Sequence, residues 1–130
     1  MSMDARSLAS LKGVHPDLIC AMNVAYDKSP VPFVIIQGMR SLAQEIENVR
    51  NGASLTMHSR HLPNEAGYAC AVDVVARPGG KVDWTPRLYQ GIASAVLAAG
   101  HTLDIPVEWG GNWTTLKDFG HFQLPWAVYP

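Results

Sequence analysis

The sequence predicts a single α+β domain that spans residues 1–130. Two observations lead to this fold class. Helical and β-rich segments follow one another without the regular strand–helix–strand rhythm of a doubly wound parallel sheet. The 130 residues, of which 48% are hydrophobic and 16% charged, are enough for one compact core and too few for two.

The first predicted helix covers residues 14–26. Pro16 fits its first turn, Asp17 suits its positive end, and apolar residues recur at helical spacing. The segment Pro30-Val31-Pro32 then breaks the chain. The apolar, β-branched run over residues 33–36 predicts a buried strand.

A second helix is predicted over residues 41–50. Ser41 and Gln44 have the spacing of a capping box, in which the two residues satisfy each other's backbone N–H groups. Asn51-Gly52 is a typical helix end, because both residue types tolerate the left-handed conformation. Residues 54–64 have no clean periodicity, so no element is predicted there.

The second half of the chain predicts three strands and one long helix. Residues 67–76 are apolar and β-rich, although Asp73 interrupts them. A helix over residues 85–100 begins with a Thr-Pro pair as N-cap and first turn, ends at a C-cap glycine, and has an apolar face that should pack on a sheet. Residues 105–109 and 122–124 are the last strand candidates.

Charge and hydropathy exclude several classes of protein. The formal net charge is −1, from 10 Lys and Arg against 11 Asp and Glu, so nucleic acid is not an expected partner. No apolar run approaches the ~20 residues that span a bilayer, so no membrane insertion is expected. Residues 1–12 lack the apolar centre of a secretory signal, which predicts synthesis in the cytoplasm without a signal peptide.

The two cysteines, Cys20 and Cys70, are too few for a disulfide scaffold. Each has apolar neighbours in the sequence. We therefore expect both to be small buried hydrophobic residues, and not metal ligands or redox groups.

Two histidines and a carboxylate on separate segments could form a metal site. His61, Asp73 and His121 can supply three ligands to zinc and leave a fourth position for water, which is the pattern of a catalytic site. Asp73 needs a partner in its apolar surroundings, and a metal is one. Asp118, three residues before His121, could take the proton from that water. Satisfied polar residues in a core are the alternative, since the ligand spacing matches no local motif.

Several other residues have both a functional and an ordinary interpretation. Asp118 and Arg40 could be plain surface or helix-start residues, and Glu45 and Glu47 are expected on the solvated face of their helix. His58 could replace a ligand, and Glu65 is a rival base. The tryptophans at positions 109 and 113 could stack on a sugar, although packing is the more common role of this residue type.

The chain resembles a known family through several motifs in the same order. These motifs are Leu11 to Leu18, Phe33 to Arg40, Gly52-Ala53-Ser54, Ser59-Arg60-His61-Leu62, Ala71-Val72-Asp73, Glu108 to Trp113, and Asp118 to Leu124. The family is that of the phage endolysin peptidases that cut the L-Ala-D-Glu bond of peptidoglycan. These belong to the wider superfamily of D-Ala-D-Ala metallopeptidases and Hedgehog-like zinc domains.

The resemblance implies a small, mostly antiparallel sheet that carries the zinc site, with helices packed on one side. It implies that His61, Asp73 and His121 hold Zn²⁺ and that Asp118 acts first as general base and later as acid. Arg40 matches an arginine beside the scissile carbonyl or a substrate carboxylate. Ser59 matches a serine of the substrate groove, and we add Trp109 to the expected substrate contacts.

One departure from the family pattern lies between the first two ligands. Eleven residues, from Leu62 to Val72, separate His61 from Asp73, which is more than the family usually has. The segment Pro63 to Gly67 therefore resembles an insertion beside the active site. It leaves the ligand assignment intact and bears on substrate preference.

The predicted function is hydrolysis of L-Ala-D-Glu in peptidoglycan stem peptides, that is, bacteriolytic cell-wall degradation during phage lysis. The alternatives are a D-Ala-D-Ala carboxypeptidase or dipeptidase, and a non-catalytic, zinc-stabilised wall-binding module. We expect a monomer that acts on the wall, in the periplasm, after release by a holin-type factor.

Overall fold

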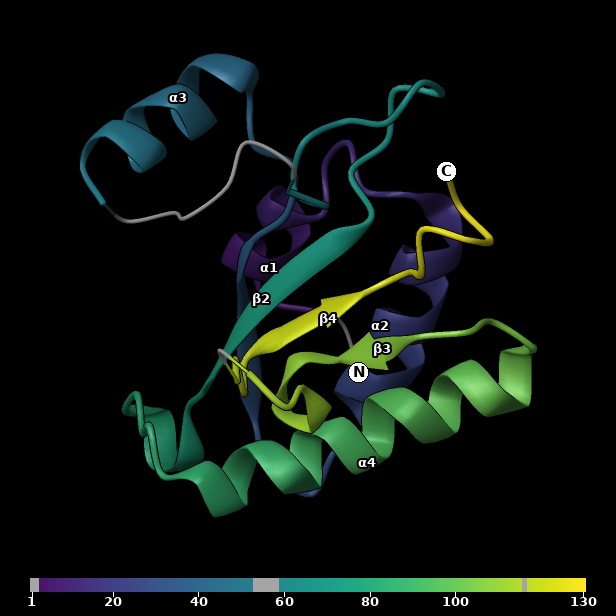
Figure 1. Cartoon of the computed structure of the whole chain (residues 1–130). Helices are drawn as coiled ribbons and strands as arrows, with labels where there is room; N and C mark the ends of the chain where they lie inside the picture. The colour runs from purple at the N-terminus through teal and green to yellow at the C-terminus, as the bar shows by residue number, and fades with distance from the viewer. Residues whose placement is uncertain (1–2, 53–58, 116) are drawn as a thin grey trace.

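The computed structural model describes residues 3–52, 59–115 and 117–130. Figure 1 shows a central antiparallel sheet with helices around it, which confirms the α+β class. The helices and strands are α1 (Ala5–Ser10), α2 (Pro16–Lys28), β1 (Phe33–Gln37), α3 (Leu42–Arg50), β2 (Ala71–Ala76), α4 (Pro86–Leu103), β3 (Glu108–Trp109) and β4 (His121–Gln123), with short 3₁₀ turns at Pro78–Gly80 and Gly110–Asn112.

The sheet has the strand order β1-β2-β4-β3, with all neighbours antiparallel. Successive side chains of a strand point to opposite faces. On β2, Val72 and Val74 therefore join the hydrophobic core, while Asp73 between them faces the other way. On β4, Phe122 is fully buried in the same core, and its neighbour His121 lies on the face of Asp73.

Helices α2 and α4 cover the apolar face of the sheet and pack against each other (Figure 1). Leu18 and Met22 of α2 and Ile92 and Val96 of α4 are all fully buried. Helix α3 stands apart from these two helices, at the opposite end of the sheet. The apolar face thus forms the core, and the other face is left for polar chemistry.

The predicted elements are confirmed, but several of their ends differ: α2 covers Pro16–Lys28 where residues 14–26 were predicted, and β2 covers Ala71–Ala76 where residues 67–76 were predicted. Ser41 caps α3, since its Oγ accepts a hydrogen bond from the Gln44 N–H at 3.1 Å. His15 caps α2 by accepting from the Asp17 N–H at 3.0 Å. The last predicted strand is displaced by one residue, and β3 is shorter than residues 105–109.

The prediction that Gly100 ends the long helix was wrong. Helix α4 continues to Leu103 and ends at Asp104, which adopts the left-handed conformation at φ 58°. Gly100 is needed for another reason: a Cβ there would lie 2.6 Å from the Ile105 carbonyl oxygen. The glycine lets the chain return closely across the helix after its end.

Helix α1 was not predicted, because it is only six residues long. Asp4 caps it by accepting from the Ser7 N–H. The hydroxyl of Ser7, fully buried, accepts from the Ile35 N–H at 3.0 Å and so ties α1 to the sheet.

Of the two cysteines, Cys70 is buried as predicted. The prediction for Cys20 was wrong, because its side chain is exposed on α2. Among the described residues, no helix has the length and apolar character to cross a membrane.

Candidate metal centre

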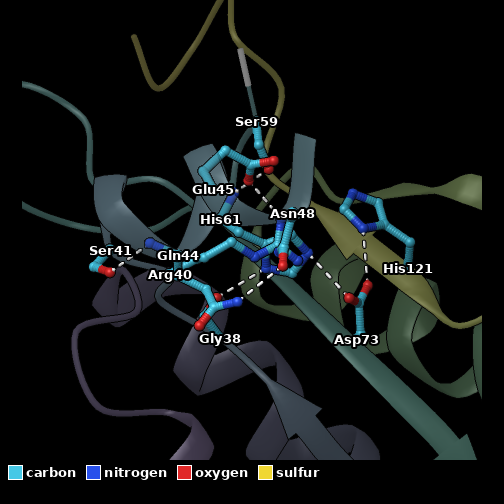
Figure 2. A network of polar contacts seen from close by, with 10 residues as sticks. All are labelled: Gly38, Arg40, Ser41, Gln44, Glu45, Asn48, Ser59, His61, Asp73 and His121. Atoms are coloured by element: carbon cyan, nitrogen blue, oxygen red, sulfur yellow. Dashed lines mark hydrogen bonds and ion pairs between the residues drawn. The ribbon is translucent and has the colours of Figure 1, made fainter. Parts of the chain in front are cut away.

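The fold brings His61, Asp73 and His121 together from three separate segments. One nitrogen or oxygen atom from each lies within 4.8 Å of the others. Figure 2 shows the imidazoles of His61 and His121 approaching the Asp73 carboxylate from different sides. Both histidines are more than nine-tenths buried, whereas Asp73 keeps part of its surface open to solvent.

Strand pairing places two of the three residues. Asp73 of β2 and His121 of β4 are direct partners in the antiparallel register, so their side chains lie side by side on the polar face. The Asp73 Oδ1 lies 3.0 Å from the His121 Nδ1.

Backbone contacts hold the loop that carries His61. The His61 N–H donates to the Ser59 Oγ at 3.2 Å, and the Arg40 N–H donates to the His61 carbonyl at 2.7 Å. The imidazole Nδ1 lies 2.8 Å from the Gly38 carbonyl, which can only accept, so Nδ1 carries a proton. This leaves Nε2 directed at the Asp73 Oδ2, at 3.2 Å.

The second histidine is oriented by a relay of two further side chains. The His121 Nε2 donates to the Gln123 Oε1 at 2.7 Å. The Gln123 Nε2 in turn donates to the Glu108 Oε1 of β3 at 3.1 Å. Sequence reasoning missed Gln123 and Glu108. The signal was the spacing of two between His121 and Gln123, which places both side chains on one face of a strand.

Asp73 and His121 stabilise each other's charged forms. Burial alone would raise the pKa of Asp73, but hydrogen bonds and charge from His121 and His61 outweigh it and hold that pKa far below its ordinary value. Burial would likewise lower the pKa of His121, but the bond to Asp73 and its charge raise it. The site therefore concentrates a negative charge between two basic nitrogens.

Asp118 lies next to this cluster through backbone contacts. Its N–H donates to the Gly110 carbonyl at 3.1 Å, and its own carbonyl accepts from the His121 N–H at 3.2 Å. The carboxyl is open to solvent, yet partial desolvation and the nearby charge of Asp73 raise its pKa. A carboxyl with a raised pKa beside such a cluster has the character of a general base or acid.

The donor set fits a divalent metal such as zinc. Two imidazoles and one carboxylate are the ligand types of catalytic zinc sites. Each histidine has one ring nitrogen fixed by a hydrogen bond, to Gly38 or to Gln123, and directs the other toward Asp73. Such outer partners orient metal-binding histidines and set their tautomers.

Comparison with known proteins gives the family. The family model of the phage L-alanyl-D-glutamate peptidases matches residues 1–122. The chain belongs to the phage L-alanyl-D-glutamate peptidase family. It is 30% identical to the L-alanyl-D-glutamate peptidase of Escherichia phage T5, over 92% of this chain and 85% of the relative.

Two further comparisons agree with this assignment. The L-alanyl-D-glutamate peptidase of Listeria phage A118 is 30% identical over 96% of this chain. The matched region makes up 43% of the length of that relative. The crystal structure of the Serratia marcescens L-Ala D-Glu endopeptidase ChiX is 49% identical and superposes with a TM-score of 0.88, over 97% of this chain and 91% of that one.

In this member of the peptidase family, Arg40 and Ser59 both form hydrogen bonds with the His61 backbone. The Arg40 Nη1 donates to the Glu45 Oε2 at 2.6 Å. Both side chains are drawn in Figure 2. Glu45 is fully buried, so the expectation that it lies on a solvated face was wrong. Glu47, by contrast, is exposed as predicted.

The remaining candidates of this family member lie outside the cluster. The Trp109 indole N–H donates to the Phe119 carbonyl at 2.8 Å, and its ring covers Gly111, where a Cβ would meet it at 2.3 Å. This gives Trp109 a packing role. Glu65 is exposed on the loop between the first two ligands, and His58 lies outside the described residues.

Proposed function

We propose that the chain is a zinc metallopeptidase that hydrolyses the L-Ala-D-Glu bond of peptidoglycan stem peptides. Membership of the phage L-alanyl-D-glutamate peptidase family supports this substrate. The observation that carries the chemistry is the convergence of His61, Asp73 and His121 within 4.8 Å, with Asp118 bonded beside them.

We assign the metal to the Nε2 of His61, the carboxylate of Asp73 and the Nδ1 of His121. Zinc bound there would polarise the scissile carbonyl and lower the pKa of a water molecule to ~7. Gly38 and Gln123 keep the two imidazoles in the orientation that this binding requires.

The proton transfers are assigned to Asp118. Its carboxylate accepts the proton of the attacking water and then hands it to the leaving amine of D-Glu. The hydrogen bonds that the Asp118 N–H donates to the Gly110 carbonyl and that the Asp118 carbonyl accepts from the His121 N–H hold the Asp118 main chain beside the proposed ligands. This main-chain placement supports the assignment of Asp118 as the base.

Arg40, Ser59 and Trp109 are the proposed substrate contacts. A guanidinium can bind a carboxylate such as that of D-Glu through two parallel hydrogen bonds, and it can stabilise developing negative charge on the scissile carbonyl. The Glu45 carboxylate restrains the Arg40 side chain, and the His61 carbonyl restrains its backbone. Of the three, Trp109 has the least structural support as a substrate contact, since its indole N–H already donates to the Phe119 carbonyl.

Digestion of purified muropeptides tests this function. Zinc-loaded protein should release products split between L-Ala and D-Glu, identified by mass spectrometry, and chelator-treated protein should not. Release of D-Ala or its dipeptide would instead support a carboxypeptidase or dipeptidase. Intact stem peptides with zinc bound would support the wall-binding module, and metal analysis of the same samples identifies the ion.

Two predictions about the cellular setting accompany this function. We expect the protein to be a monomer, which sedimentation measures directly. We also expect it to reach the cell wall with the help of a holin-type release factor. Co-expression with and without a holin, followed by measurement of lysis, tests the second expectation.

A further inference from the structure

A cavity lies beside the proposed metal centre, between the loop after His61 and the C-terminal segment. Its volume is about 450 Å³, and Ser59, Leu62, Glu65 and Trp126 line it. Pockets that bind small ligands commonly measure about 300–1,000 Å³. The cavity begins at Ser59, whose Oγ accepts from the His61 N–H, so it adjoins the first proposed metal ligand.

Hydrogen bonds fix the walls of this cavity. Arg60 is only 4% exposed; its Nε donates to the Leu124 carbonyl at 3.1 Å and its Nη2 to the Tyr129 carbonyl at 2.6 Å. The Arg60 guanidinium carbon lies 4.0 Å from the centre of the Trp126 ring. Asn64 donates to the Pro130 carbonyl at 3.1 Å, which closes the far side. A rigid, preformed cavity loses little entropy when a ligand binds.

The lining suits a neutral ligand that has hydroxyl groups and an apolar face. The Arg60 guanidinium keeps its positive charge, but its Nε and Nη2 donors are used by the Leu124 and Tyr129 carbonyls and its carbon lies against the Trp126 ring, so few of its N–H groups remain for a ligand. Glu65 is an exposed carboxylate, which accepts hydroxyl hydrogens and repels acids. Leu62 and the 41% exposed Trp126 supply apolar surface. Sugar rings combine these two properties, whereas the acidic groups of the stem peptide do not.

We propose that this cavity binds the N-acetylated sugar that carries the stem peptide. The inference rests on the proposed function. The first residue of the stem, L-Ala, is joined to a muramyl sugar, so the glycan lies one residue from the L-Ala-D-Glu bond. The cavity is correspondingly close to the proposed metal site. Ser59, which lines it, is two positions from His61 in the sequence and accepts a hydrogen bond from the His61 N–H. Trp126 and Glu65 are thus specificity residues for glycan-linked substrate.

A pair of substrates tests the proposal. We expect kcat/KM for a disaccharide-linked tetrapeptide to exceed that for the free tetrapeptide by about tenfold, as one good aromatic contact would give. Trp126→Ala and Glu65→Gln should reduce this ratio toward one while keeping cleavage of the free peptide. Trp84→Ala is the matched control, since Trp84 is 67% exposed at the start of α4. It should leave the ratio unchanged.

A binding measurement separates this proposal from the proposed function. N-acetylmuramyl-L-alanine, which has no L-Ala-D-Glu bond to cleave, should shift the indole N–H signal of Trp126 and not that of Trp84 in an NMR spectrum when it is titrated into the zinc-loaded protein. An equal kcat/KM for the two substrates in the unmodified protein, or no shift of Trp126, would overturn the sugar site. Absence of cleavage of both substrates, together with a shift of Trp126, would overturn the peptidase function and keep the sugar site.

Discussion

Arg40 and Glu45 form an ion pair of 2.6 Å in which the carboxylate is completely buried and the guanidinium nearly so. The pair joins the first turn of α3 to the segment that follows β1. The Arg40 N–H also donates to the His61 carbonyl. A charge pair on a peripheral helix is thereby connected to the backbone of a proposed metal ligand.

Breaking this pair should be costly. Glu45→Gln leaves the Arg40 charge without its counterion, and removal of one partner of a buried pair costs about 3–5 kcal/mol. Glu47→Gln is the matched control on the same helix, because Glu47 is exposed and its 3.8 Å ion pair with the exposed Arg50 is open to solvent. Its effect should stay within about 0.5 kcal/mol. Urea unfolding of both variants measures the difference, and equal stabilities would contradict a structural role for the pair.

Asp118→Asn should lower kcat by about 10²–10⁴-fold, the usual contribution of a positioned general base. The amide is nearly the same size but cannot accept the proton, so zinc content should not change. Asp104→Asn is a suitable control, since Asp104 ends α4 in a left-handed conformation that asparagine also adopts. Peptide hydrolysis and metal analysis are measured on the same preparations. Full activity of the Asp118 variant would rule out this base.

Gln123→Leu should weaken zinc binding by about 10–100-fold, the usual effect of losing an outer partner of a metal ligand. The leucine removes the acceptor for the His121 Nε2 and leaves that nitrogen without its 2.7 Å bond. Gln90→Leu makes the same exchange at an exposed position of α4. Competition with a coloured zinc chelator gives both affinities. Equal values in the two variants would show that the relay to Glu108 does not tune the site.

Gly110→Ala should reduce both stability and activity. A Cβ at Gly110 would lie 2.4 Å from the Asp118 carbonyl oxygen and 3.2 Å from the His121 Cβ, so the proposed base or a proposed metal ligand must move. Such overpacking costs about 1–3 kcal/mol. Gly91→Ala is the contrasting case, because the new methyl would meet only side-chain atoms, of Val31 at 3.3 Å and Pro30 at 3.5 Å, within a helix that favours alanine. Thermal unfolding and kcat/KM should separate the two variants.

Tyr129 should make folding stability sensitive to alkaline pH. Burial and the 2.8 Å hydrogen bond to Asp17 raise the pKa of its hydroxyl from 10.0 to about 12. Because the folded state favours the protonated phenol, this stabilisation is complete below pH 10 and disappears as the pH rises toward 12. Urea unfolding of the unmodified protein and of Tyr129→Phe should therefore differ most below pH 10. A difference that grows above that pH would contradict the assignment.

Local sequence signals predicted most helix and strand positions. The capping residue Ser41 was recognisable because it acts on a backbone group only three positions away. The apolar, β-rich run that Asp73 interrupts indicated a strand with one polar side chain. These signals need no knowledge of distant contacts.

Other features depend on neighbours that are remote in sequence. Gly100 has the sequence appearance of a helix end, but the backbone of Ile105 decides its role. Burial of Glu45 could not be read from a helix whose other acidic residue, Glu47, is exposed. The partnership of Gln123 with Glu108 exists only because β3 pairs with β4. The exposed side chain of Cys20 likewise reflects which face of α2 meets the core.

The direct pairing of Asp73 with His121 links the proposed metal site to correct strand pairing. If β4 slipped by one residue along β2, Phe122 would enter the polar face and His121 would turn into the hydrophobic core. A mispaired chain would thus lose both the buried packing of Phe122 and the proposed set of metal ligands. The amount of zinc that a preparation takes up should therefore report the fraction of molecules with native strand pairing.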